Sequence, residues 1–170
     1  MKYSMSIFML CLILLTIPFS SCQNSTSPDS FTIYYNSFEK SSDLMGWNGI
    51  EESDLVDDAA PNGGQKSAFI SGGCNMPTAF RTFSPIGVDQ SVRIQCYGKN
   101  LGFGGSVVIG IGENYSYDLG LSVKDTTWTF YEFDNSIFWP ANSSLTICLN
   151  SGGILATAML IDELKIVKSN

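Results

Sequence analysis

Short runs in which apolar and polar residues alternate recur along the chain from residue 31 onward. In residues 91–97 the apolar positions are Val92, Ile94 and Cys96, and residues 145–149 repeat the same spacing. Because successive side chains of a strand point to opposite faces, each run predicts a β-strand with one apolar and one polar face. No stretch of this region keeps a helical period of apolar residues, so the pattern favours an all-β fold.

The pattern predicts nine strands, separated by turns that are rich in glycine, asparagine and proline. The predicted strands are residues 32–35, 67–70, 79–83, 91–97, 106–111, 118–123, 127–133, 144–149 and 158–167. About nine short strands are typical of a jelly-roll β-sandwich, in which two sheets pack face to face. The residues that we expect to find buried between the sheets are Val92, Ile94, Leu145, Ile147, Leu164 and Ile166.

An uncharged apolar segment, Ile7–Phe19, precedes the strand region. It is too short to cross a hydrocarbon core of roughly 30 Å as a helix, but it fits the hydrophobic part of a secretory signal peptide. The small residues Ser20 and Ser21 follow it and lead to Cys22. This order resembles a bacterial lipoprotein signal, although Phe19 stands where an aliphatic residue is commoner.

The resemblance implies that residues 1–21 are a signal peptide and that Cys22 becomes a lipid-carrying N-terminus. Residues 22–30 are then the lipidated cysteine and a serine-rich tether, and residues 31–168 form one jelly-roll domain. Gln23, rather than an aspartate, follows the cysteine, which implies an anchor in the outer membrane of the cell envelope. The alternative is an ordinary secretory leader that is cut near Ser21.

The 170-residue chain carries a net charge of −7 and contains no histidine. Nucleic-acid binding requires clustered basic residues, and an acidic chain with few of them argues against that partner. The lack of histidine excludes Ser-His-Asp and Cys-His catalysis as well as histidine-based zinc sites. The acidic pairs at 51–52 and 57–58 are adjacent on predicted loops, unlike the separated carboxylates of a glycosidase. We therefore expect no catalytic residues and no enzyme activity.

Besides the cysteine of the leader and the candidate lipid site, the chain contains three cysteines, namely Cys74, Cys96 and Cys148. They allow three pairings, with one thiol left over in each case. Cys96 lies on an apolar strand face and is predicted to be a small buried thiol. A disulfide, if one forms, is then expected between Cys74 and Cys148.

Short motifs at the two ends of the strand region carry a second resemblance. Residues 36–39 (NSFE) and 46–47 (GW) lie near its start, and residues 160–166 (LIDELKI) lie near its end. This order resembles carbohydrate-binding modules of the galactose-binding-like jelly-roll group. The resemblance implies a jelly roll whose first strand, within 31–35, lies beside its last, 158–167. Members of this group bind glycans, lipids, peptides or proteins, so the fold alone does not name a ligand.

Several members of the group hold a structural calcium ion between an N-terminal glutamate and an aspartate of the last strand. The matching positions here are Glu39 and Asp162. Because Ca²⁺ takes six to eight oxygen ligands, backbone carbonyls of the 62–66 turn are expected to complete the site. The alternative is that both side chains are solvated carboxylates at strand ends.

A glycan site combines aromatic rings, which stack on the C–H faces of sugars, with planar polar groups that pair with hydroxyls. Such residues occur on a polar strand face and in two predicted loops. The predicted ligand-binding residues are Arg93, Gln95, Tyr97, Tyr115 and Trp139. Trp47 and Trp128 are expected in the core. The alternative to a glycan-binding protein is a structural or adhesive envelope protein that uses the same fold.

Overall fold

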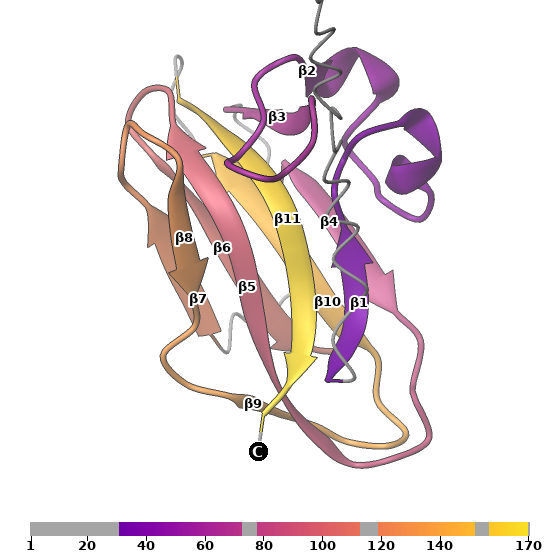
Figure 1. The fold of residues 1–170 in the computed structure, drawn as a ribbon. Coiled ribbons are helices and arrows are strands. Elements are labelled where there is room, and N and C mark those ends of the chain that lie inside the picture. The colour runs from indigo at the N-terminus through magenta and orange to yellow at the C-terminus, as the bar shows by residue number, and fades with distance from the viewer. Residues whose placement is uncertain (1–30, 73–77, 113–118, 152–156, 170) are drawn as a thin grey trace, which may run out of the picture.

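Two antiparallel β-sheets pack face to face in the computed structural model, which describes residues 31–72, 78–112, 119–151 and 157–169 (Figure 1). The larger sheet contains β1 (Thr32–Asn36), β2 (Leu55–Val56), β3 (Ser67–Ser71), β5 (Gln90–Asn100), β8 (Thr129–Glu132), β9 (Ile137–Trp139) and β11 (Ala158–Lys168). The smaller sheet contains β4 (Ala79–Phe83), β6 (Gly105–Ile111), β7 (Leu119–Val123) and β10 (Leu145–Ser151). The architecture confirms the predicted all-β jelly-roll sandwich.

The larger sheet has the order β2-β3-β11-β5-β8, and β1 and β9 make additional pairs with β11 and β5. The smaller sheet has the order β4-β10-β6-β7. In the β1–β11 pair, Tyr35 lies opposite Lys165 and Asn36 lies opposite Leu164. The first and last strands are therefore neighbours, as predicted.

Eleven strands, rather than the nine predicted, are present in the described residues. The two additional strands are β2, which has two residues, and β9, which has three. Segments this short hold too few residues to show an alternating pattern. β9 is also followed directly by Pro140, which marks a turn in the sequence.

The apolar faces of the two sheets form the core between them. The six residues predicted to be buried, from Val92 to Ile166, are all 0% exposed. Cys96 is also fully buried, and burial raises the pKa of its thiol to about 12. The alternation of the long strands thus assigns their buried faces correctly.

The segment between β1 and β3 wraps over one end of the larger sheet (Figure 1). It includes two short 3₁₀-helices, η1 (Ser41–Leu44) and η2 (Glu52–Asp54). Trp47 fixes this segment to the sandwich, because it is 7% exposed and its ring packs 5.8 Å from that of Phe38. Trp47 therefore belongs to the core, as predicted.

Candidate functional site

Three of the predicted ligand-binding residues share the outer face of the larger sheet. Arg93, Gln95 and Tyr97 alternate along β5 with residues that are fully buried, so their side chains point away from the core. The neighbouring strand β8 places Glu132 opposite Gln95 and Phe130 opposite Tyr97. The structure thus gathers aromatic and planar polar groups from two strands on one accessible surface.

The geometry of this surface is fixed by pairwise contacts between the two strands. The Arg93 guanidinium forms an ion pair with Glu132 at 3.0 Å. The rings of Tyr97 and Phe130 meet edge to face, with centroids 5.5 Å apart and planes inclined by 63°. Phe130 remains 49% exposed, so this aromatic pair is open to a ligand.

Trp128 extends the same surface and is half-buried, which corrects its predicted place in the core. Its indole N–H donates to Asp58 Oδ1 at 2.9 Å, and Lys99 Nζ pairs with Asp58 Oδ2 at 2.7 Å. The hydrogen bond from Lys99 lowers the pKa of the Asp58 carboxyl. The alternation in 128–132 was the missed signal, because it places Trp128 on the same face as Phe130 and Glu132.

Trp139 is 1% exposed, so it lies in the core and cannot stack on a sugar. Its indole N–H donates to the Ser143 carbonyl at 2.6 Å. The prediction treated this segment as a loop, but β9 turns Ile137 and Trp139 inward and Phe138 outward. Trp139 is therefore removed from the candidate site, and Tyr115 lies outside the described residues.

Two other predicted sites also involve residues outside the described part of the chain. Cys148 is a free thiol that is 3% exposed, and burial raises its pKa to about 11. Its predicted disulfide partner, Cys74, lies outside the described residues, as does the predicted lipidation site, Cys22. The described residues include no helix long and apolar enough to span a membrane.

The two predicted calcium ligands both contact the loop of residues 60–66. Glu39 Oε1 accepts hydrogen bonds from the backbone N–H groups of Gln65, at 2.9 Å, and Lys66, at 3.0 Å. Asp162 is 0% exposed, and its Oδ2 accepts from the Ala60 N–H at 2.9 Å. One loop therefore joins two carboxylates that are far apart in the sequence.

Two consecutive glycines make room for these carboxylates. A Cβ atom on Gly63 would lie 2.2 Å from Asp162 Oδ2, and one on Gly64 would lie 2.2 Å from Glu39 Oε1. The described residues other than glycine that adopt a positive φ are Phe38 (53°), Asn62 (70°) and Glu163 (51°). In the sequence these three residues are direct neighbours of Glu39, Gly63 and Asp162, respectively. Such strained conformations concentrate at functional sites.

The charge at this loop is negative. Burial raises the pKa of Asp162 to about 7, and the charges of Glu163 and Glu39 also raise it. None of the ion pairs formed among the described residues includes Glu39 or Asp162. No group of three or more acidic, cysteine or histidine side chains that could hold a metal occurs in that part of the chain, so further oxygen ligands would come from backbone carbonyls, neutral side chains or water. Two carboxylates without a cationic partner fit a Ca²⁺ site of this kind.

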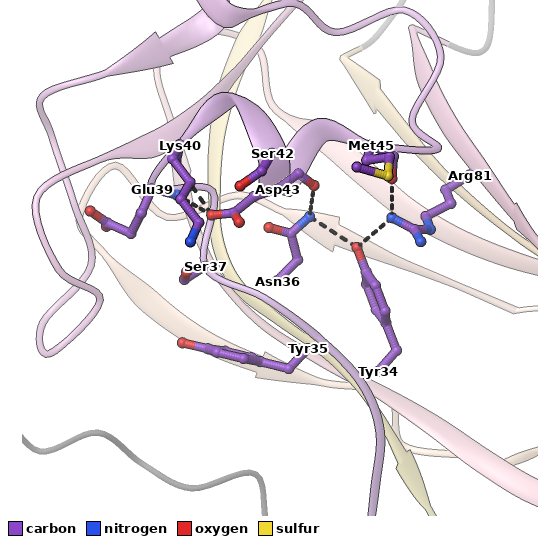
Figure 2. A pocket seen from close by; sticks show the side chains of 10 residues that line it. All are labelled: Tyr34, Tyr35, Asn36, Ser37, Glu39, Lys40, Ser42, Asp43, Met45 and Arg81. Carbon is purple, nitrogen blue, oxygen red and sulfur yellow. Dashed lines mark hydrogen bonds between the residues drawn. The ribbon is translucent and has the colours of Figure 1, made fainter.

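A cavity of about 1020 Å³ lies beside β1, between this strand, η1 and Arg81 of β4 (Figure 2). The Tyr34 hydroxyl on its wall accepts hydrogen bonds from Asn36 Nδ2 at 2.9 Å and from Trp47 Nε1 at 3.1 Å. Arg81 donates to the same hydroxyl at 3.2 Å and to the Met45 carbonyl at 2.5 Å. No residue of this cavity other than Glu39 was predicted to bind a ligand or metal, because the cavity forms between segments distant in the sequence.

The jelly-roll sandwich is similar to that of several carbohydrate-binding modules of known structure. A family 22 carbohydrate-binding module of Clostridium thermocellum Xyn10B matches with a TM-score of 0.60 and 13% identity, over 84% of this chain and 97% of that one. The CBM22-1 xylan-binding domain of Paenibacillus barcinonensis Xyn10C matches with a TM-score of 0.56 and 17% identity, over 81% and 94%. No protein-family model and no curated protein matches the sequence.

Proposed function

We propose that the protein binds carbohydrate, without catalysing a reaction, through the outer face of the larger sheet. This sheet face consists of Arg93, Gln95, Tyr97, Lys99, Trp128, Phe130 and Glu132. The observation that carries the proposal is the Tyr97–Phe130 ring pair, in which Phe130 is exposed and which lies next to the Arg93–Glu132 ion pair.

The chemistry of the sheet face suits a sugar polymer. Aromatic rings stack on the C–H faces of sugars, while guanidinium, amide and carboxylate groups pair with hydroxyls. Residues 93–99 of an extended strand span about 20 Å, so the sheet face is broad enough to hold a sugar chain that crosses its strands. Asp58 and Glu132 are each held in an ion pair, which fits a binding role better than proton transfer.

The structural neighbours indicate which ligand to test first. Two of these neighbours are xylan-binding domains, so xylan and its oligosaccharides are the first candidates. A shallow site with few stacked rings should bind with a Kd of roughly micromolar to millimolar, because little burial offsets the entropy lost on association.

The test is calorimetry of the chain from Gln23 onward with xylohexaose, cellohexaose and soluble polysaccharides. Tyr97→Ala and Phe130→Ala should each weaken binding by about tenfold, the equivalent of about 1.4 kcal/mol. Phe103→Ala is the matched control, because Phe103 is 85% exposed but lies in the loop between β5 and β6. Binding that is unchanged in both sheet-face variants would show that the sugar binds elsewhere on the protein. No binding by the wild type would favour the structural or adhesive envelope protein.

Glu39 and Asp162 are proposed to hold a structural Ca²⁺ ion together with backbone carbonyls of residues 62–66. Bound calcium would neutralise carboxylates that lack a cationic partner and would join β1, the 60–66 loop and β11. A ligand that binds only the folded state adds about 2.7 kcal/mol to the free energy of unfolding at a hundredfold excess over Kd. Millimolar Ca²⁺ should raise the Tm relative to EDTA in the wild type but not in Asp162→Ala, and no rise in the wild type contradicts the site.

The mature protein is proposed to be a lipoprotein of the cell envelope, anchored in the outer membrane through Cys22. Each buried CH₂ of an acyl chain contributes about 0.8 kcal/mol, so two or more chains anchor a protein firmly. The wild type should incorporate a palmitate analogue and sediment with membranes, whereas Cys22→Ala should do neither. Labelling that persists in Cys22→Ala would contradict the anchor.

A further inference from the structure

Tyr35 connects the sheet face to the cavity beside β1. The strand registers place Tyr35 opposite Lys165, Lys165 opposite Gln95, and Gln95 opposite Glu132. These four residues form one row across β1, β11, β5 and β8. Since neighbouring strands lie about 4.8 Å apart, the row covers about 14 Å from β8 to the cavity. A single ligand that reaches both ends must therefore be a polymer.

The Tyr35 ring lines the cavity (Figure 2). Two residues of β11 that are not part of the lining hold it in place. The Tyr35 hydroxyl donates to the Glu163 carboxylate. Lys165 Nζ lies over the ring, 5.4 Å from its centroid. A ring with so little freedom loses little conformational entropy when a ligand stacks on it.

The charges around the cavity balance one another. Glu39 and Asp43 are acidic, whereas Lys40 and Arg81 are basic. Asp43 Oδ2 already accepts the backbone N–H groups of Glu39, at 2.9 Å, and Lys40, at 3.3 Å. A strongly charged ligand would gain little here, whereas a neutral molecule with many hydroxyl groups fits an aromatic wall edged with polar groups.

We propose that this cavity is a second sugar-binding subsite, which holds one end of an uncharged glycan chain that crosses the larger sheet. The inference rests on the proposed function of the sheet face and extends it. The ligand is thus a chain of several sugars, rather than a single sugar, and it runs across the strands along the Tyr35–Glu132 row.

The test fills the cavity and compares a long and a short oligosaccharide by calorimetry. Ser42 of η1 is exposed and lines the cavity, so Ser42→Trp should obstruct it. Ser41→Trp is the matched control, because Ser41 is exposed on the same 3₁₀-helix but is not part of the lining. Ser42→Trp should weaken xylohexaose binding by about tenfold but change the binding of xylobiose, which is too short to reach both subsites, less than about twofold, and Ser41→Trp should change neither.

Two indole N–H signals in NMR spectra report the two subsites separately. Trp47 donates to Tyr34 on the cavity wall, and Trp128 donates to Asp58 beside the sheet face. Xylohexaose should shift both signals in the wild type, but only the Trp128 signal in Ser42→Trp.

The possible failures are distinguishable. If Trp128 shifts while Trp47 does not, or if Ser42→Trp binds xylohexaose normally, the cavity proposal is wrong and the sheet face stands. If Trp47 shifts while Trp128 and the affinity of Tyr97→Ala stay unchanged, the cavity binds sugar alone, and both the sheet-face function and the crossing chain are wrong. If neither signal shifts, both proposals fail.

Discussion

Single residues determine whether the loop of residues 60–66 can approach two carboxylates. Gly64 adopts a φ of +92°, and a Cβ atom there would clash with the Glu39 carboxylate. Asp162 is buried near Glu39 and Glu163, so its ionised form is disfavoured. These details make the loop sensitive to the addition of one methyl group or the loss of one charge.

Gly64→Ala should lower the free energy of unfolding by about 2–4 kcal/mol, because it combines an unfavourable φ with displacement of the Glu39 carboxylate from the N–H groups of Gln65 and Lys66. Gly87→Ala is the matched control, since Gly87 also has a positive φ, +75°, but a Cβ there would meet nothing within 4 Å. That control should cost only about 1–2 kcal/mol in urea denaturation. Equal losses in the two variants would show that no clash occurs at Gly64.

The pKa of Asp162 predicts a pH dependence in calcium-free buffer. It is raised from 3.8 to about 7, so the folded state holds a proton that the unfolded state has released over that range. The contribution of Asp162 to the free energy of unfolding is therefore complete below about pH 4. It falls by on the order of 4 kcal/mol as the pH rises to about 7.

Urea denaturation in EDTA at several pH values measures this slope. Asp162→Asn should reduce the decline between pH 4 and 7, because the amide does not titrate. The amide also accepts fewer backbone hydrogen bonds than the carboxylate does, so the absolute free energy of unfolding changes as well. The quantity to compare is therefore its slope with pH. A variant with the slope of the wild type would assign the pH dependence to other groups.

At the scale of elements, alternation in the sequence predicted the long strands and their buried faces. β5, β10 and β11 each hold several apolar residues at every second position, so their faces are clear from the sequence. β9 has only three residues, and missing it led to the wrong placement of Trp139. The short strand becomes evident only through its pairing with β5, which is distant in the sequence.

Trp139→Ala should lower the free energy of unfolding by about 3–5 kcal/mol, because it leaves a large cavity in the core. The adjacent Phe138→Ala is the control, since Phe138 is 57% exposed on the opposite face of β9. A surface change of this kind usually stays within about 0.5 kcal/mol. Chemical denaturation of the two variants compares them directly, and a near-neutral Trp139→Ala would contradict the inward orientation.

At the scale of the whole molecule, the sequence predicted the sandwich better than its surfaces. The Arg93, Gln95 and Tyr97 side chains could be placed together because they belong to one strand. The Asp58–Trp128 hydrogen bond and the Tyr35–Glu163 contact join residues that are far apart in the sequence, so no local pattern predicts them. The cavity beside β1 is of the same kind, because its walls come from two sheets and a connecting segment.

The pairing of the first strand with the last has a mechanical consequence. β1 begins at Thr32 and pairs only with β11 among the described strands. A pull on residue 31 back along the strand axis loads the hydrogen bonds between Thr32 and Val167 and those near Asn36 and Leu164 at the same time. These hydrogen bonds then bear the load together, in shear, and do not break one after another. A molecule held by its N-terminus would therefore resist detachment of β1 when a bound ligand pulls against that attachment.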